Sequence, residues 1–178
     1  MVELGPFHIL SYGTLLGVEV FQSFIGGIVS FRVLPRPQFS LLQSNIFPIY
    51  FSLQTALPVV AALTYPGERT LVGNGPSSLA GVFTPENRLS TLLPLATVFI
   101  TGLTNLAFLG PQTIKVMDER KKREIIDGKK SYDPAPHSKE MMALNKKFGK
   151  LHGYSTLVNL AAILATISYG YVLGKRIY

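Results

Sequence analysis

The chain contains no cysteine, which removes three chemistries at once: disulfide bridges, thiolate metal ligands and cysteine nucleophiles. Charge is also scarce, at 15% of 178 residues, against roughly 25% in an average soluble domain. A water-facing surface needs more charge than this. The composition therefore excludes a soluble enzyme domain, a disordered tail and a disulfide-stapled secreted module.

Recognisable catalytic patterns are missing as well. The sequence has no nucleophile elbow, no phosphate-cradling glycine loop before a helix, no paired acids in an apolar run and no acidic metal cluster. His8 and His152 fall near opposite membrane edges, so they are not placed to share a metal ion. We therefore expect a non-enzymatic protein without a cofactor or a metal.

Four long apolar runs make up most of what the chain does have. A helix needs roughly 20 apolar residues to cross a hydrocarbon core about 30 Å thick, because it rises about 1.5 Å per residue. The runs cover residues 7–31, 46–65, 89–109 and 151–173. They predict an all-α fold, a polytopic membrane protein whose single domain (1–178) is a four-transmembrane-helix bundle with a basic cytosolic helical loop between helices 3 and 4. Pro58 and Pro94 lie inside the second and third runs, where each predicts a kink unless it falls in the first turn.

The 17 Lys and Arg residues are distributed unevenly, and most of them follow the first and third runs. By the positive-inside rule both of these segments are cytosolic, and both chain ends are lumenal or exoplasmic. The formal charge of +7 is then an orientation signal, and we expect no nucleic-acid partner. The endoplasmic reticulum or another secretory endomembrane is the expected location, with a mitochondrial membrane as the alternative. Residues 66–88, rich in Gly and Pro, should form a flexible exoplasmic connection without chemistry of its own.

The basic segment, about residues 112–150, joins the third and fourth runs. Residues 112–127 have the pattern of a helix that continues out of the membrane and stops at Gly128, and Ser138 is placed to cap the next helix. Two pairs spaced four residues apart should support the first of these helices: Asp118 with Lys122, and Glu119 with Arg123.

Four consecutive bases within this helix form a candidate headgroup-binding site: Arg120, Lys121, Lys122 and Arg123. Each base near an anionic membrane surface contributes about 1 kcal/mol to binding. Membrane lipids with anionic headgroups are therefore expected partners on the cytosolic face. The alternative interpretation is a topology signal on a solvated helix with no ligand.

Glu19 is the one acid or base well inside a run, near the middle of the first. An isolated carboxylate in hydrocarbon is costly, so the side chain should face the bundle interior and either carry a proton or find donors. Gly13 and Gly17, one to two turns earlier, form a small-residue pair that favours close helix packing. The candidate intramembrane polar site comprises six residues: Glu19, Gln22, Gln54, Asn105, His152 and Asn159.

Two interpretations of this polar site stay open. In the first, interhelical hydrogen bonds worth about 0.6 kcal/mol each fix the packing of the four helices. In the second, Glu19 with Asn105 and Asn159 lines a site for a polar headgroup, a cation or a proton.

Several short motifs at the edges of the runs resemble the transmembrane protein 205 family. They are FRVLPR at 31–36, Phe39, Gln43-Ser44, FPIYF at 47–51, PQT at 111–113, Met117, Phe148, His152-Gly153, Ser155, Leu157 and Asn159-Leu160. Glu19 stands where that family's pattern leads us to expect a Gln. The resemblance implies a four-helix membrane protein of the secretory system.

Two functions follow as hypotheses. The first is an accessory or scaffolding subunit of a larger membrane assembly, with membrane-protein partners. The alternative is a small carrier or binding protein for a lipid or amphipathic solute, which would use the polar bundle centre.

Overall fold

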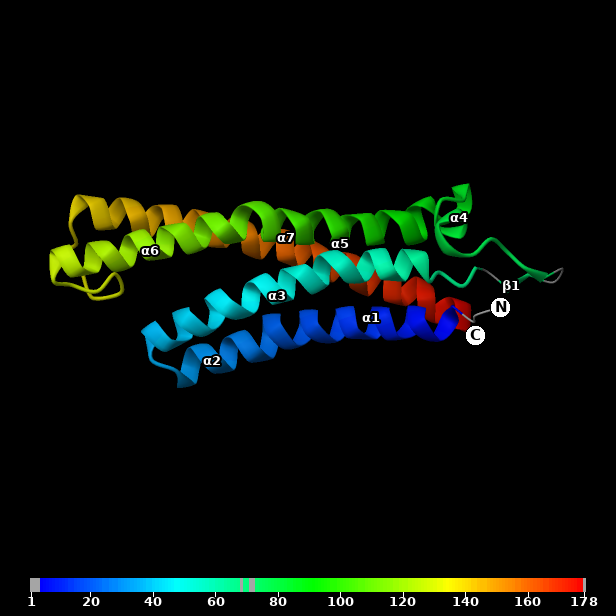
Figure 1. Cartoon of the computed structure of the whole chain (residues 1–178), viewed down its shortest axis with the longest axis horizontal. Helices are drawn as coiled ribbons and strands as arrows, with labels where there is room; N and C mark the ends of the chain where they lie inside the picture. Colours follow the sequence, from blue (N-terminus) through cyan, green and yellow to red (C-terminus); the bar gives the residue numbers. More distant parts are fainter. Residues whose placement is uncertain (1–3, 68, 71–72, 178) are drawn as a thin grey trace.

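The computed structural model describes residues 4–67, 69–70 and 73–177. Four helical segments in it are long and apolar enough to cross a membrane, and they run side by side along the length of the molecule (Figure 1). Their bounds are Gly5–Val33, Arg36–Leu63, Pro85–Asp127 and Lys139–Lys175. The predicted all-α, four-helix membrane fold is therefore confirmed.

All four segments carry irregular turns or extend beyond the predicted runs. The first consists of α1 (Gly5–Val20), the π-helical turn η1 (Phe21–Gly26) and α2 (Gly27–Val33). The second is α3 (Arg36–Leu63), and the fourth is the single helix α7 (Lys139–Ile177). The third contains η2 (Pro85–Asn87), η3 (Arg88–Leu92), α5 (Leu93–Thr104), η4 (Asn105–Leu109) and α6 (Gly110–Asp127).

The prolines explain part of this irregularity. Pro94 and Pro111 each fall in the first turn of the helix that follows a π-helical turn, η3 and η4 respectively. A missing N–H costs least in a first turn, where that group has no helical partner in any case. Pro58 lies inside α3 and leaves the carbonyl of Gln54 without its usual helical donor.

The two ends of the bundle differ. Both chain ends and α4 (Ser78–Val82) lie at one end, which we call the terminal end (Figure 1). The α2–α3 turn and the α6–α7 connection lie at the other, which we call the basic end (Figure 1). The two basic segments thus share one end of the molecule, in the hairpin arrangement that their sequence predicts.

The connection between α3 and α5 is more ordered than its composition predicts. β1 (Arg69–Thr70) pairs antiparallel with β2 (Gly73–Asn74), and α4 follows. Asn87 donates from Nδ2 to the Tyr65 hydroxyl at 3.1 Å and to the Gly81 carbonyl at 2.9 Å. The expectation of a flexible loop is therefore wrong for the part that holds Gly81 and Asn87, because these buried residues bond to the end of the bundle.

The glycines at which helices approach closely are not the predicted ones. A Cβ added at Gly13 or Gly17 would meet nothing within 4 Å, so the predicted small-residue pair is not a helix contact. A Cβ at Gly102 of α5 would lie 3.0 Å from the backbone of Gln54 on α3. At Gly170 of α7 it would collide with the hydroxyl of Tyr12 on α1.

The hairpin formed by α6 and the first turns of α7 reaches further than the α2–α3 turn (Figure 1). Its first helix ends as predicted at Gly128, which has a φ of +60°. Ser138 caps the second helix, since its Oγ accepts a hydrogen bond from the Met141 amide at 3.1 Å. The charge pairs differ from those predicted: Arg123 bonds Asp127 at 2.8 Å, and Lys121 bonds Asp118 at 3.4 Å.

Candidate functional site: a buried polar centre around Glu19

Glu19 is completely buried, as its place in the apolar run requires. Its Oε1 accepts a hydrogen bond of 2.8 Å from Nε2 of Gln54, which is also completely buried. This contact joins α1 to α3 at the middle of the bundle. Gln54 is thus the amide donor that an intramembrane carboxyl at this depth needs.

Three further side chains extend the hydrogen bonds from Gln54 toward the basic end. Asn159 of α7 accepts at Oδ1 from Gln54 Nε2 at 3.1 Å and from the Tyr50 hydroxyl at 2.7 Å. Its own Nδ2 donates to Ser23 Oγ at 3.0 Å, and Ser23 lies 3.5 Å from the Tyr50 hydroxyl. We call Glu19, Gln54, Asn159, Tyr50 and Ser23 the central network. It connects three of the four membrane segments.

The network leaves several buried oxygen atoms without a hydrogen bond among the described residues. These include Oε2 of Glu19 and Oε1 of Gln54. Thr166 of α7 faces the Glu19 carboxyl, yet its Oγ1 is also without a partner at ordinary hydrogen-bond distance. Buried polar atoms nearly always have a hydrogen-bond partner, so these unpaired oxygen atoms distinguish the centre from a site that serves packing alone.

Apolar side chains pack on the terminal-end side of Glu19. Leu15, one turn earlier on α1, forms a buried cluster with Val98 of α5 and Ala162 of α7. The hydrogen bonds of the central network run from Glu19 toward the basic end.

Three of the six predicted polar-site residues lie outside this network. Gln22 bonds instead to Gln43 at 2.8 Å, and Gln43 bonds to Ser30 at 2.9 Å, in a separate cluster nearer the basic end. Asn105 is buried, and its Nδ2 reaches the Ser155 carbonyl at 3.4 Å. The structure therefore unites Glu19, Gln54 and Asn159, but joins neither Gln22 nor Asn105 to them.

His152 is placed outside the bundle centre. Helical spacing puts it on the face of Asn159, but it lies two turns nearer the basic end. The side chain is exposed there, and its ring stacks on Phe148 with centroids 5.8 Å apart. Its inclusion in the polar site is therefore wrong.

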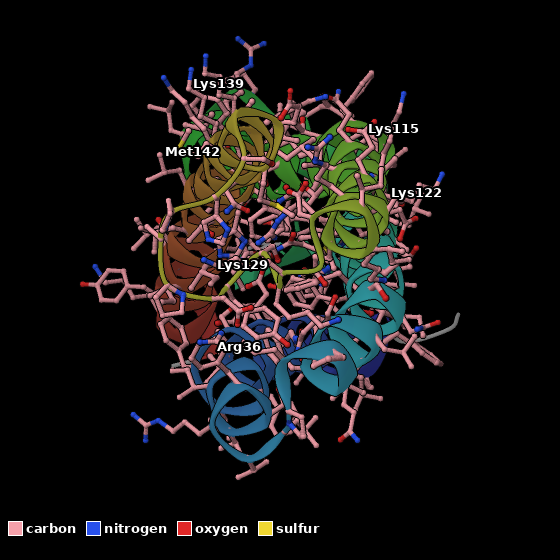
Figure 2. The ribbon with its side chains drawn as sticks, turned by 90° about the vertical axis from the view of Figure 1, so that its left-hand side faces the viewer. Arg36, Lys115, Lys122, Lys129, Lys139 and Met142 are labelled. Atoms are coloured by element: carbon pink, nitrogen blue, oxygen red, sulfur yellow. The ribbon has the colours of Figure 1, made fainter. Side chains whose placement is uncertain are left out.

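The structure divides the predicted headgroup cluster in two. Arg120 lies over the Phe148 ring at 4.5 Å, and Arg123 bonds Asp127 and Glu140, so both arginines hold α6 against α7. Lys121 and Lys122 are exposed. Figure 2, viewed from the basic end, shows Lys122 pointing outward from α6 with Lys115, and Lys139 pointing outward on the opposite side.

The distance of this cluster from the membrane also matters. α6 continues the line of α5, and the cluster begins 11 residues after Leu109, which places it about 16 Å or more beyond the third apolar run. The headgroup layer on one side is only about 5–8 Å thick. Headgroup binding by Lys121 and Lys122 stays a prediction, and the geometry favours a ligand in solution or on a partner over the chain's own membrane.

The sequence interpretation missed Tyr50, which is buried at the centre of the network. At the start of an apolar run a Tyr usually marks the membrane interface. The signal that could have found it is spacing, because Tyr50 precedes Gln54 by four residues and so shares its helix face.

Comparison with known proteins places these features in a family. The model of the "Domain of unknown function (DUF4149)" family matches residues 10–122. The xanthocillin biosynthesis cluster protein D of Aspergillus fumigatus is 33% identical over 175 residues, which cover 98% of this chain and 92% of that protein. No solved structure matches. The matched residues 10–122 include most of α1, all of α3 and α5, and four members of the central network. With the near full-length relative, this match shows that the chain belongs to the DUF4149 family.

Proposed function

We propose that this protein is a non-enzymatic accessory subunit that anchors a partner protein to a membrane through the α6–α7 hairpin. The observation that carries the proposal is the end of α6, where Ile125 and Ile126 are 83% and 72% exposed. Two neighbouring isoleucines outside the apolar run, on a helix that projects from the bundle, are costly in water. Covering them with a partner removes that cost.

Charge indicates what kind of partner fits. Lys122 lies one turn before Ile126, and Lys121 and Lys129 flank the pair in sequence. The two acids beside the isoleucine pair are engaged in ion pairs, Asp127 with Arg123 and Glu124 with Lys130. The occupant is therefore an acidic protein surface with an apolar groove for the two isoleucines.

The relative's name supports an accessory role. It is a protein of a biosynthesis cluster. By analogy, the partner of the present chain is a soluble enzyme of a biosynthetic assembly that acts at the membrane. The basic end is cytosolic in this proposal, the chain ends are lumenal, and the membrane belongs to the secretory system. The resemblance to the transmembrane protein 205 family stays a prediction.

The alternative function, a carrier for a lipid or amphipathic solute, has less support. Two surface hollows, of about 550 and 210 Å³, lie at the basic end on α6 and beside the α6–α7 connection. Neither includes Glu19 or another member of the central network. Direct side-chain contacts hold the polar centre together, and neither of the two hollows reaches it.

The test compares two substitutions on opposite sides of the hairpin. Membranes that contain the chain are extracted in a gentle detergent and separated on native gels. The double substitution Ile125→Asp with Ile126→Asp should return the chain from a larger assembly to its own mass. Met142→Asp is the matched control, since Met142 is exposed on α7 and lies on the other side from Lys122 (Figure 2). A wild-type chain that migrates alone, or an assembly unaffected by the double substitution, would refute the proposal.

Orientation can be tested independently because the chain has no native cysteine. A single Cys at Lys129 or at Phe83, which lie at opposite ends, is treated with a membrane-impermeant maleimide in sealed secretory vesicles whose cytosolic face is outside. The proposal predicts labelling at position 129 and protection at position 83. The reverse pattern would contradict it.

A further inference from the structure

Glu19 lies as far from water as this chain allows. It is the fifteenth of 29 residues in the segment Gly5–Val33, so about 21 Å of helix separates it from either end. Its side chain has no exposed surface. A bare carboxylate at this depth needs a compensating charge or several donors.

The groups that face Glu19 do not supply that compensation. Tyr12 comes from its own helix, Tyr50 and Gln54 from α3, and Thr166 from α7, while α5 contributes apolar packing through Val98. None of these side chains is cationic. The one hydrogen bond of ordinary length is the 2.8 Å contact from Gln54 to Oε1.

The second carboxyl oxygen shows what is missing. Oε2 of Glu19 has no partner among the described residues, and neither does the adjacent Thr166 Oγ1. The Thr166 hydroxyl can donate one hydrogen bond to Oε2, but together with Gln54 this gives a carboxylate two neutral donors and no cation. A hydrogen atom on Oε2 turns this oxygen into a donor, and a small movement then joins it to Thr166.

We propose that Glu19 is a proton-binding site: in the native bundle its carboxyl group is a neutral acid, and its proton exchanges with water through the central network. The proposal is independent of any partner at the hairpin.

The central network provides the path. From Glu19 it runs through Gln54 and Asn159 to Tyr50 and Ser23, with successive contacts of 2.8, 3.1, 2.7 and 3.5 Å. Ser23 is partly exposed. A water molecule that enters there meets hydrogen-bonding groups at each step.

The exchange step is simple in its chemistry. The O–H bond of the Glu19 acid breaks, the electron pair stays on Oε2, and the proton passes to a water molecule to give a hydronium ion. The reverse step restores the acid. No oxidant, reductant or metal takes part.

The direct test is infrared spectroscopy of the full chain in lipid nanodiscs at neutral pH. A neutral carboxylic acid has a carbonyl band well separated from the carboxylate bands. The wild-type protein should show this band, and it should shift on incorporation of carboxyl-labelled [¹³C]glutamate. Glu19→Gln should abolish it, whereas Glu86→Gln, which alters an exposed acid, should leave it. Absence of the band, or its persistence in Glu19→Gln, overturns the proposal.

The isotope experiment uses the unmodified chain, so it stays decisive even where Glu19→Gln fails to fold. A cation at the site is a separate outcome. In that case the acid band is absent and the thermal midpoint rises with sodium or potassium concentration, which overturns proton binding.

Transfer to D₂O tests the path. The acid band shifts as the proton is replaced, and the rate of this shift should fall several-fold in Tyr50→Phe and in Ser23→Ala. Ser52→Ala is the matched control, because Ser52 is an exposed serine of α3, the helix of Tyr50, and its hydroxyl donates to the carbonyl of Pro48. Equal rates in all variants overturn the assigned path.

Discussion

Gly102 of α5 lies against the backbone carbonyl of Gln54 on α3, the carbonyl that Pro58 leaves without a helical donor. A Cβ at this glycine would lie 3.0 Å from the carbon and 3.1 Å from the oxygen of that group. One proline and one glycine, 44 positions apart in the printed sequence, therefore meet at one contact between α3 and α5.

Gly102→Ala should separate α3 from α5. The added methyl meets backbone rather than the end of a flexible side chain, and overpacking of this kind costs about 1–3 kcal/mol. The thermal midpoint in detergent should fall. Gly13→Ala is the control, since a Cβ there meets nothing within 4 Å and helix propensity favours Ala by about 0.5–1 kcal/mol. A midpoint unchanged by Gly102→Ala would contradict the close approach.

His8 joins three helices at the terminal end. Its Nδ1 lies 2.8 Å from the carbonyl of Ala61, one of the last in α3, and its Nε2 lies 2.6 Å from the Tyr169 hydroxyl of α7. A carbonyl can only accept, so Nδ1 carries a hydrogen and donates it to Ala61, while Nε2 pairs with the Tyr169 hydroxyl.

Tyr169→Phe should remove this contact and lower the free energy of unfolding by about 0.5–1.5 kcal/mol, the net contribution of a typical hydrogen bond. The measurement is the denaturant or thermal midpoint of purified protein. Tyr171→Phe is the control, because Tyr171 is 66% exposed. Equal effects of the two substitutions would show that the His8–Tyr169 contact contributes nothing to stability.

The α6–α7 connection should open in acid. The hydrogen bond from Ser138, at 2.6 Å, and the pairing with Arg123 hold the pKa of Asp127 below its ordinary value. At Glu124 burial acts to raise the pKa, but hydrogen bonds from Ser131 and the nearby Lys130 outweigh it, and the pKa is again lowered. Groups with lowered pKa values stabilise the fold fully above their ordinary values, 3.8 and 4.5, and lose that contribution as the pH falls through the lowered values.

A spin label at a single Cys in place of Tyr132 can report this opening. Its mobility should stay constant from neutral pH to about pH 5 and rise as the pH falls below about 4. Asp127→Asn should raise the mobility at neutral pH already, whereas Asp118→Asn, at an exposed pair, should not. Mobility independent of pH would refute the role of the two carboxylates.

Arg120 and Lys122 lie two positions apart on α6, but replacing each by Ala should have different effects on amide exchange in this helix. Arg120→Ala removes a cation–π contact with Phe148, worth about 0.5–1 kcal/mol, and uncovers the face between α6 and α7. Amide exchange in α6 should therefore become faster. Lys122→Ala should leave exchange unchanged, because the side chain is exposed. Similar exchange in the two variants would show that the arginine is not part of the packing.

Much of the fold could be predicted from the sequence because a membrane imposes a length. Four runs of about 20 apolar residues fix four helices, and Gly128 and Ser138 fix the end of α6 and the start of α7. The start of α3 at Arg36 was not predicted, because two prolines close together, Pro35 and Pro37, usually interrupt a helix. Pro37 is instead accepted in the first turn of that helix.

The candidate site was predicted only in part. Glu19, Gln54 and Asn159 stand out because polar side chains in apolar runs must find partners. Tyr50 does not stand out in this way, and the inward direction of Arg120 depends on Phe148, 28 positions later in the printed sequence. Helix periodicity says which side chains share a face. It does not say which neighbouring helix covers that face at a given height, as the exposed His152 shows.

α7 is one unbroken helix of 39 residues, about 58 Å long. Its first turns carry Glu140, which pairs with Arg123 in the hairpin, and its last turns carry Tyr169, which bonds His8 at the far end of the bundle. Asn159 lies between them in the central network. No loop interrupts α7 between these attachments, so one helix carries the hairpin contact, the central network and the terminal-end contact together.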